Sequence, residues 1–328
     1  YIQAEDDYFL SERYNKDKKY WQEKITTCPD KTLVKIDTEN SKNIEVKRIT
    51  RILSVSLKQA IEKYCADSSL TPAVIFETAL ISYLSRINDE NKDIIIGVPV
   101  LNRVNIYEKQ ISGMFVSTMP LIVKIDENSR LYDIEERIKS EHMNIFRHQK
   151  YPYADILKYV RENYNYAGNL YDVMLSFQNA TTDIKAKTKW YSNGYGEAPL
   201  TINIDNRDEL NSYTINVDYQ IKVFNTDQEV LFLIKRLENI LWQIVKDSNQ
   251  LVKNISIIPD EEFETVINHY NNTQTENVDN QCVHDLFKEH VKKQPNKTAL
   301  IFEDTTFSYD EIDKMSNSLA NFLREKEV

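Results

Sequence analysis

The stretch from Asp93 to Ile125 constrains the fold of this chain more than any other. It reads DIIIGVPVLNRVNIYEKQISGMFVSTMPLIVKI, with apolar runs at both ends and a polar middle. The pattern predicts a strand at 94–96, a break at Gly97-Val98-Pro99, a loop, and a second apolar segment from Met114 to Ile125.

Two of the five glycines in the chain, Gly97 and Gly113, lie in this stretch. A residue without Cβ permits a positive φ or lets another backbone segment or a ligand come close. We therefore expect a loop that carries Arg103 and the pair Ser117-Thr118 and is held at both ends by buried strands. On residue physics alone, a plain strand pair with a surface arginine in its connection is the simpler interpretation.

The 328 residues can form two domains or one large one, and 41% hydrophobic residues are enough for a sizeable core. No segment approaches the roughly 18 apolar residues of a membrane helix. The first residues have neither the basic nor the apolar region of a signal peptide. We expect a cytoplasmic protein of which Tyr1 is an internal residue.

Composition also argues against several functions. A net charge of −10 disfavours nucleic acid as a partner, because phosphate binding needs clustered lysine and arginine. The cysteines Cys28, Cys65 and Cys282 are odd in number and lack metal-ligand spacing, which indicates reduced thiols, with Cys65 in the core. No glycine-rich phosphate loop or G-x-G-x-x-G motif is present.

Periodicity and capping residues predict the remaining elements. Ser56 is expected to cap a helix that carries Cys65, and Thr71-Pro72 to begin a second helix that is apolar nearly all round. The other expected elements are helices at 6–24, 131–148, 154–164 and 226–245, and strands at 44–55, 173–177, 200–204 and 213–219. Asp126 and the pair Glu135-Glu136 are interpreted as solvated charges.

A polar tract at 271–281 has no apolar periodicity and is interpreted as part of a linker between domains. Beyond it, we expect a helix from Val283, a short strand at 299–302, and a second helix after the capping box Ser308-Tyr309-Asp310-Glu311. About 50 residues are too few for such a module to fold around a core of its own.

Two motifs resemble the C-terminal half of condensation domains in nonribosomal peptide synthetases. The first is Ile96-Gly97-Val98-Pro99 with Asn102-Arg103 and then Gly113-Met114-Phe115-Val116-Ser117-Thr118, where the family usually has Asn in place of Ser117. The second is His148-Gln149-Lys150-Tyr151-Pro152-Tyr153, which resembles a His-Gln-x-x-Pro-Phe element. The residues after 282 resemble the start of an adenylation domain.

The resemblance implies an α/β fold: a chloramphenicol-acetyltransferase-like lobe, a mixed sheet flanked by helices, followed by a small truncated piece of an adenylation domain. The implied domains are the end of an N-terminal lobe with its crossover helix at 1–35, the C-terminal lobe at 36–259, a linker at 260–281 and the adenylation start at 282–328. The implied partners are the N-terminal lobe, carrier domains and the rest of the adenylation domain.

The family's catalytic motif, His-His-x-x-x-Asp-Gly, is absent from this sequence, and none of its five histidines are adjacent. We therefore assign no catalytic, cofactor-binding or metal-binding residue. The resemblance makes tunnel-lining or structural candidates of Arg103, Gly113, Ser117, Thr118, His148 and Gln149. Arg103 could equally be a solvated charge, and His148 could either orient a tunnel loop or satisfy carbonyl groups at a helix end.

The function implied is amide-bond formation between thioesters tethered to carrier domains, by a parent enzyme of which this chain is a piece that is inactive alone. 4'-Phosphopantetheine would belong to the partner carrier domains, and ATP and Mg would bind only the complete adenylation domain. The alternative is a noncatalytic scaffold that docks carrier proteins. Condensation, epimerisation and initiation all remain open, as do the two substrates.

Overall fold

The computed structural model describes residues 2–29, 32–35, 43–88, 93–126, 128–178, 191–206, 211–273 and 282–327. These residues divide into two compact units, 1–263 and 264–328, and each is described by itself. The first unit holds α1 (Ile2–Phe9), α2 (Glu12–Lys24), β1 (Val46–Ile52), α3 (Val55–Ser68), α4 (Pro72–Ile87), β2 (Asp93–Val100), α5 (Ile106–Gln110), β3 (Ser117–Lys124), α6 (Leu131–His148), α7 (Tyr153–Tyr164), β4 (Val173–Gln178), β5 (Leu200–Asp205), β6 (Thr214–Gln220), α8 (Asp227–Lys246) and η1 (Val252–Asn254).

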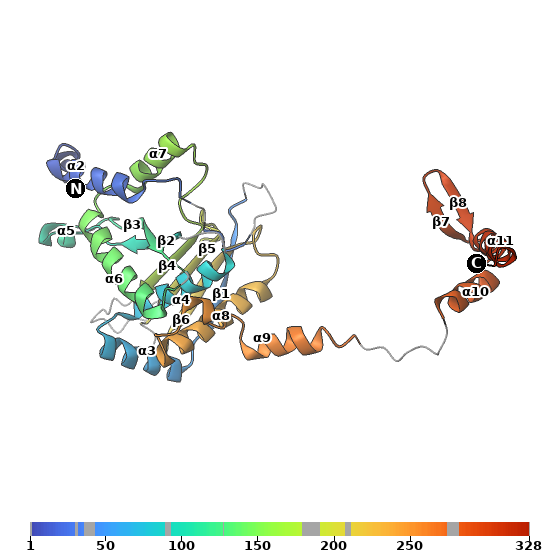
Figure 1. Ribbon diagram of the computed structural model, residues 1–328. Coiled ribbons are helices and arrows are strands. Elements are labelled where there is room, and N and C mark those ends of the chain that lie inside the picture. Colours follow the sequence, from blue (N-terminus) through green and yellow to red (C-terminus); the bar gives the residue numbers. More distant parts are fainter. Residues whose placement is uncertain are drawn as a thin grey trace. The chain divides into compact units, whose positions relative to one another are not determined.

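A six-stranded sheet in the order β1-β6-β5-β4-β2-β3 organises the first unit (Figure 1). β4 pairs in parallel with both β2 and β5, whereas the β1-β6, β5-β6 and β2-β3 pairs are antiparallel. The expected mixed sheet flanked by helices is therefore confirmed. Buried and half-buried residues alternate along β5, as expected of a strand with one face on the core.

The predicted break at Gly97-Val98-Pro99 is wrong, because β2 continues through it to Val100. Gly97 pairs with Pro120 and Pro99 with Thr118 of β3. Pro120 is tolerated because β3 lies at the edge of the sheet, where a strand needs hydrogen bonds on one side only. The second segment begins as a strand at Ser117 and not at Met114, whose side chain is exposed.

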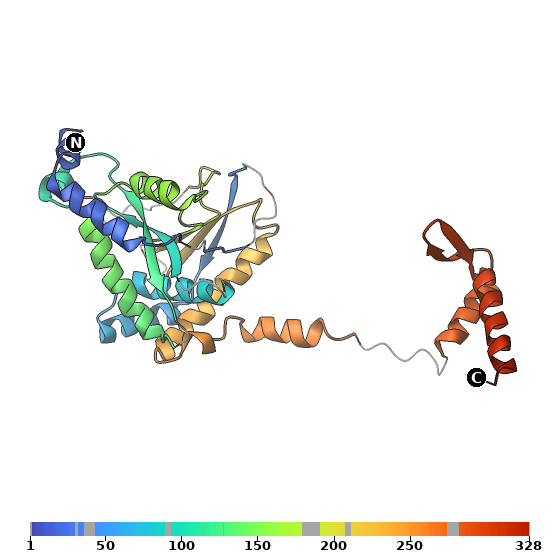
Figure 2. The same ribbon diagram turned by 45° about the horizontal axis from the view of Figure 1, so that its top comes forward.

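Helices α3, α4, α6 and α8 lie together on one side of the sheet (Figure 1 and Figure 2). Every residue of α4 from Val74 to Leu84 is buried, which confirms that this helix is packed on most sides. Cys65 of α3 is buried in the same core, also as expected. Among the described residues no single helix has the length and apolar composition to cross a membrane, although α3 and α4, bent by 106°, pass that test as a pair.

Two helix boundaries differ from those predicted. The residue that caps α3 is Ser54 and not Ser56: Ser54 has extended backbone angles, and its hydroxyl accepts the N–H of Leu57. Ser56 lies within the first turn, and Val55 belongs to the helix and not to the preceding strand. The helix expected at 6–24 is two helices, because Ser11 starts α2 by accepting the N–H of Tyr14.

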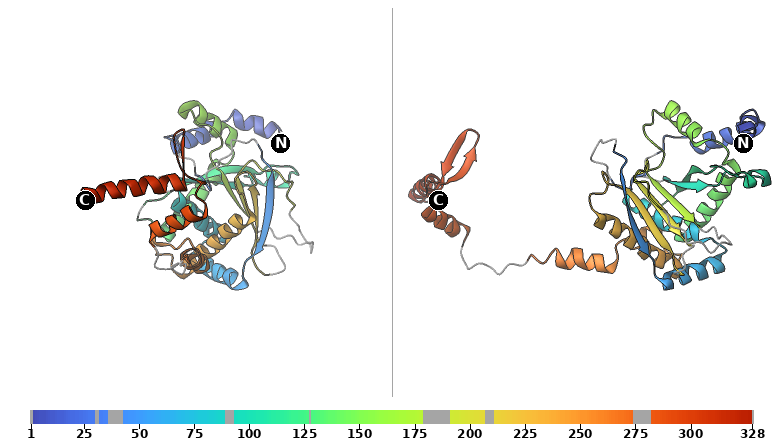
Figure 3. Two further views of the ribbon diagram at one scale, coloured as in Figure 1. Left: turned by 90° about the vertical axis from the view of Figure 1, so that its right-hand side faces the viewer. Right: turned by 180° about the vertical axis from the view of Figure 1, so that it is seen from behind.

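The second unit begins inside a helical segment, α9 (Asp260–Glu264) followed by the π-helix η2 (Thr265–His269). The interval 260–281 assigned to a linker is thus helical in its first half, and its residues 274–281 lie outside those described. Next come α10 (Val283–Lys293), the hairpin β7 (Thr298–Phe302) and β8 (Thr305–Ser308), and α11 (Tyr309–Glu325) (Figure 3). Ser308 and Glu311 form the expected capping box.

Candidate functional site

Arg103 holds together the loop between β2 and β3. Its guanidinium donates hydrogen bonds to the carbonyl groups of Glu108, Ile111 and Gly113, with an Nη2 to oxygen distance of 2.9 Å for Gly113. It also lies over the Phe115 ring, 4.0 Å from the ring centroid. Arg103 is therefore a partnered residue of the loop and not a free solvated charge.

Ser117 and Thr118 lie in β3 itself and not in the loop, and both are half-buried. The nearest polar partner of the Ser117 hydroxyl is the sulfur of Met119 at 3.9 Å, a weak acceptor. The Tyr171 ring lies directly against β2, because a Cβ built at Gly97 would come within 2.6 Å of it.

Gln149 connects the C-terminal end of α6 to the start of the loop. Its Oε1 accepts the backbone N–H of Asn102 at 2.9 Å, and its Nε2 donates to the Phe146 carbonyl at 2.8 Å. Asn102 has a positive φ of 52°, a conformation that asparagine tolerates better than most residues. The Asn102-Arg103 motif and the His-Gln motif, 47 residues apart in sequence, thus meet in space.

His148, the last residue of α6, attaches α2 to this helix. Its Nδ1 lies 2.7 Å from Oδ1 of Asp17, whose side chain is 0% exposed. Its ring stacks on Tyr20 with a centroid distance of 4.0 Å. Arg13 and Tyr8 also donate to Asp17, so the buried carboxylate is fully hydrogen-bonded. His148 therefore joins α2 to α6. One expectation was that its ring would satisfy carbonyl groups at the helix end, but the ring bonds the Asp17 carboxylate.

A pocket of about 490 Å³ opens between α4 and α6, beside the carboxyl ends of β2 and β4. In sheets with parallel strands, ligands commonly bind at the carboxyl ends of those strands. Arg103 and Gln149 line this pocket, whereas Gly113, Ser117, Thr118 and His148 do not. Its remaining lining comes from residues 71–73, Glu77, 98–101, Lys109, His142, Phe146, Leu175 and Phe177.

Glu77 and His142 form an ion pair in the wall of this pocket, which the sequence did not suggest. His142 Nε2 lies 2.6 Å from Glu77 Oε2, and the two side chains are only 18% and 4% exposed. Burial alone would lower the pKa of His142, but the hydrogen bond and negative charge of Glu77, with Glu141 nearby, raise it overall. The one feature of the sequence that could have indicated this pair is Glu77, an acidic residue inside the nearly all-apolar helix α4.

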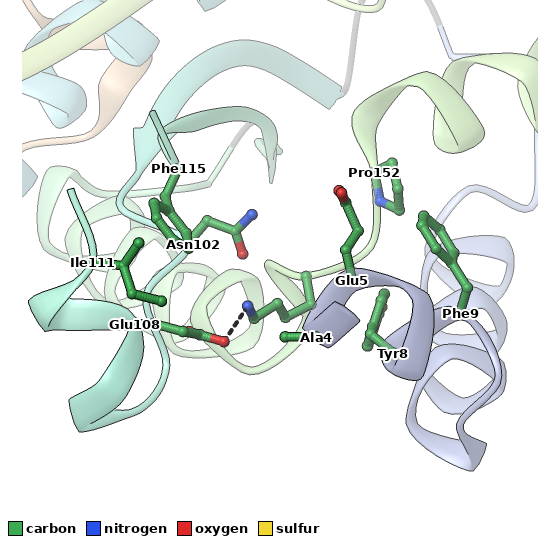
Figure 4. Close-up of a pocket in the computed structure, with 10 residues that line it drawn as sticks. Ala4, Glu5, Tyr8, Phe9, Asn102, Glu108, Ile111, Phe115 and Pro152 are labelled. Carbon is green, nitrogen blue, oxygen red and sulfur yellow. Dashed lines mark hydrogen bonds and ion pairs between the residues drawn. The ribbon is translucent and has the colours of Figure 1, made fainter. Parts of the chain in front are cut away.

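A second, much smaller pocket of about 50 Å³ lies between α1 and the loop that Arg103 organises. Figure 4 shows Tyr8 and Phe9 of α1 on one side of it and Ile111 and Phe115 of the loop on the other. Lys150, which also lines this pocket, donates to Glu108 at 2.6 Å. The space suits a water molecule or two and not a substrate.

The interpretation of Glu135 as a solvated charge is wrong. Its side chain on α6 is 2% exposed, and its Oε2 accepts the hydroxyl of Tyr64 at 2.8 Å. Burial, with the charge of Glu136, raises the pKa of Glu135 to about 7 although the Tyr64 hydrogen bond opposes the shift. In the sequence Glu135 stands among charged residues, and the contact with Tyr64 of α3 that accompanies its burial cannot be read from that pattern.

Comparison with known proteins identifies relatives of the chain. Residues 1–267 match the family model described as condensation domain. The whole chain is 27% identical over 333 residues to surfactin synthase subunit 1 of Bacillus subtilis strain 168, of which it covers 9%. Over 291 residues, or 86% of this chain, it is 25% identical to gramicidin S synthase 2 of Aneurinibacillus migulanus, of which it covers 6%. The chain thus spans less than a tenth of the length of these two relatives.

Solved structures share the fold at low sequence identity. A four-domain nonribosomal peptide synthetase bound to AMP and glycine aligns with a TM-score of 0.75 and 13% identity, over 95% of this chain and 25% of that one. The first condensation domain of the calcium-dependent antibiotic synthetase, in complex with a substrate analogue, gives a TM-score of 0.66 and 15% identity, over 78% of this chain and 56% of that one. The fold is therefore that of a condensation domain.

Proposed function

This chain belongs to the condensation domain family, and from that premise we propose that it takes part in amide-bond formation by a nonribosomal peptide synthetase. The acceptor aminoacyl amine attacks the carbonyl carbon of a donor thioester, the C–N bond forms, and the thiolate of the donor's carrier arm leaves. The match over residues 1–267 is the observation that carries this proposal.

The chain's part in this reaction would be to position substrates. The pocket at the ends of β2 and β4 offers an apolar wall with a few fixed polar groups, as small-molecule sites do. Arg103 and Gln149 act as positioning residues, because their hydrogen bonds set the loop and the end of α6 that line the pocket. Holding the amine and the thioester in contact accounts for a large part of such catalysis. Gly113, Ser117 and Thr118 remain candidates for the tunnel wall outside this pocket.

We place this chain as the C-terminal lobe of the domain, with residues 1–35 as the end of the preceding lobe. A second lobe would then supply the His-His-x-x-x-Asp-Gly motif and hydrogen-bond donors to the developing oxyanion. The coverage of 56% of a solved condensation-domain chain supports this division. Alone, the chain would lack the opposite wall of the tunnel and would form no peptide bonds.

Residues 282–328 are proposed as the start of an adenylation domain. The four-domain synthetase aligns with 95% of this chain, more than residues 1–267 can account for. Apolar side chains of α10 and α11 such as Leu286, Leu319 and Phe322 are exposed within this unit, as expected of a piece that packs on a larger domain.

Carrier domains would present both substrates on 4'-phosphopantetheine arms, which this chain receives as part of the substrate. ATP and Mg belong to the complete adenylation domain and not to the described part of it. Its one cluster of metal-ligating groups is Cys282, His284 and Asp285, and the soft thiol and imidazole do not suit Mg²⁺, which prefers oxygen ligands. The three free cysteines fit a reducing compartment such as the cytoplasm.

The alternative is a noncatalytic scaffold that docks carrier proteins. One observation favours it: the candidate side chains with the strongest hydrogen bonds, Arg103 and His148, bind the loop and Asp17 and so already have structural partners.

Product formation separates the two functions. The chain is mixed with two loaded carrier proteins, alone or fused to a preceding lobe that carries His-His-x-x-x-Asp-Gly, and dipeptidyl product is measured by mass spectrometry. We expect product from the fusion and only the uncatalysed background from the chain alone. A fusion that binds both carriers without product would favour the scaffold. Product from the chain alone, abolished by Arg103→Ala or Ser117→Ala, would place the chemistry in this lobe.

A further inference from the structure

The pocket between α4 and α6 has a charge opposite to that of the whole chain. The chain carries a net charge of −10, yet the pocket is lined by the cations Arg103 and Lys109 and by the His142 ring. Among the described residues, Arg103 bonds backbone carbonyl groups and the Phe115 ring and has no acidic partner, so its charge is not cancelled there. Lys109 is exposed and has no ion pair among the described residues.

Glu77 is the one acidic residue of the lining, and its charge is already balanced. Its Oε2 lies 2.6 Å from His142 Nε2, and this contact raises the pKa of His142 and so favours the protonated imidazole as its counter-ion. Glu77 is therefore committed to His142 and is directed away from a ligand. Arg103 and Lys109 are the two arginine or lysine side chains of the lining, and we expect them to make the potential in the pocket positive.

The backbone dipole of α4 adds to the positive charge at the pocket. Thr71, Pro72 and Ala73 at the N-terminal end of the 16-residue helix α4 line the pocket, and the Thr71 side chain makes no capping hydrogen bond. The positive end of this helix thus faces the pocket and favours a nearby negative group. It supplements the two cations and would not suffice alone.

The deeper lining is apolar. Val98, Val100 and Leu175 are almost fully buried and form part of the wall. The volume of about 490 Å³ lies within the roughly 300–1,000 Å³ of typical small-molecule sites. A ligand that satisfies both features has an apolar stem and a negatively charged end.

We propose that this pocket binds the carboxylate of an acidic acyl or aminoacyl substrate, with Lys109 and Arg103 facing the charge and Val98, Val100 and Leu175 packing against the stem. Lys109 would act as a specificity-determining residue, since it is the flexible cation without a partner. The identification of the ligand as an acyl or aminoacyl substrate rests on the proposed function. The binding of a carboxylate in this pocket does not depend on it.

A phosphate ester is the other anion that a carrier-dependent protein would meet, and it shares the same chemistry at the cations. The carboxylate fits better, because a doubly charged phosphate is more costly to transfer from water to a wall built of valine and leucine. The test therefore compares both anions on one stem.

The experiment uses the full chain with isotope-labelled valine and leucine methyl groups, followed by NMR. Butyrate, butylammonium and butyl phosphate are titrated, with Val98, Val100 and Leu175 as reporters of the pocket. We expect saturable shifts with butyrate and none with butylammonium. Equal or tighter binding of butylammonium overturns the charge assignment, and butyl phosphate binding more than about ten-fold tighter than butyrate overturns the carboxylate.

The variant Lys109→Gln tests the residue. Butyrate affinity should fall about two- to five-fold, the effect of removing one exposed charge. Lys63→Gln, which removes another exposed lysine, on α3 and outside the pocket lining, should leave the affinity unchanged. An unchanged affinity in Lys109→Gln, or an equal loss in Lys63→Gln, contradicts the proposal. Because no carrier protein or product is involved, the outcome is independent of the amide-forming test.

Discussion

Gly97 is a single residue on which the packing of the site depends. A Cβ built at this position would come within 2.6 Å of Cε2 of Tyr171, so glycine is required by a close approach of an aromatic ring. The sequence left open a positive φ or the approach of a backbone or ligand at Gly97, and it did not indicate a side chain, because Tyr171 is 74 positions away, on the connection that leads into β4.

We expect Gly97→Ala to lower the free energy of unfolding by about 1–3 kcal/mol, the usual cost of overpacking a filled core. Replacing the ring should relieve the clash, so Tyr171→Leu combined with Gly97→Ala should be less destabilised than the sum of the two single variants. Chemical denaturation of the four proteins measures this coupling. Strictly additive losses would show that the ring is not the obstacle.

Glu135 predicts a pH dependence of stability. Its pKa rises from 4.5 to about 7 on folding, so the folded protein binds this proton more tightly than the unfolded chain. Below pH ~4.5 the carboxyl group is protonated in both states and its ionisation does not lower the stability. The free energy of unfolding then decreases progressively as the pH rises toward ~7. We compare the free energy of unfolding of Glu135→Gln with that of the parent protein. This difference should grow in favour of the variant by about 2 kcal/mol from pH 5 to pH 8.

Denaturation curves at both pH values measure this gain, and Glu162→Gln on the exposed face of α7, which does not contribute to the pKa of Glu135, is the matched control. A gain that does not change with pH would mean that Glu135 is ionised in the folded protein.

At the scale of elements, the start of α3 shows what a sequence pattern leaves undecided. Ser54 and Ser56 are equally good capping residues by type, and only the path of β1 into the helix selects Ser54. We expect Ser54→Ala to cost about 1 kcal/mol of unfolding free energy and Ser56→Ala much less. The two variants are compared by thermal unfolding; a larger loss in Ser56→Ala would restore the boundary expected from sequence.

The regular elements were largely predictable because their signals are local. The helices at 131–148 and 227–246 and the strand at 173–178 follow the apolar spacing closely. The path of β2 through Pro99 was not predictable, since it depends on pairing with β3 and on the edge position of that strand. Proline and glycine signal a break only when no neighbouring strand holds the backbone.

At the scale of the whole molecule, the two sequence motifs do meet, through Gln149 and Asn102. The pocket they border could not be predicted in full, because two of its six polar lining residues, Glu77 and His142, meet although they are 65 residues apart on two helices. Such a pair has no spacing pattern in sequence. The linker expected at 271–281 stays a prediction, because residues 274–281 lie outside those described.

The central claim is that the pocket between α4 and α6 belongs to the amide-forming site. Ala73, at the start of α4, lines this pocket, whereas Ala66 on α3 is exposed and does not. In the fusion with a preceding lobe, Ala73→Trp should reduce dipeptidyl product more than about ten-fold by filling the pocket. Ala66→Trp should leave product unchanged, and both variants should unfold at the temperature of the parent. Full activity in a folded Ala73→Trp protein would contradict the claim.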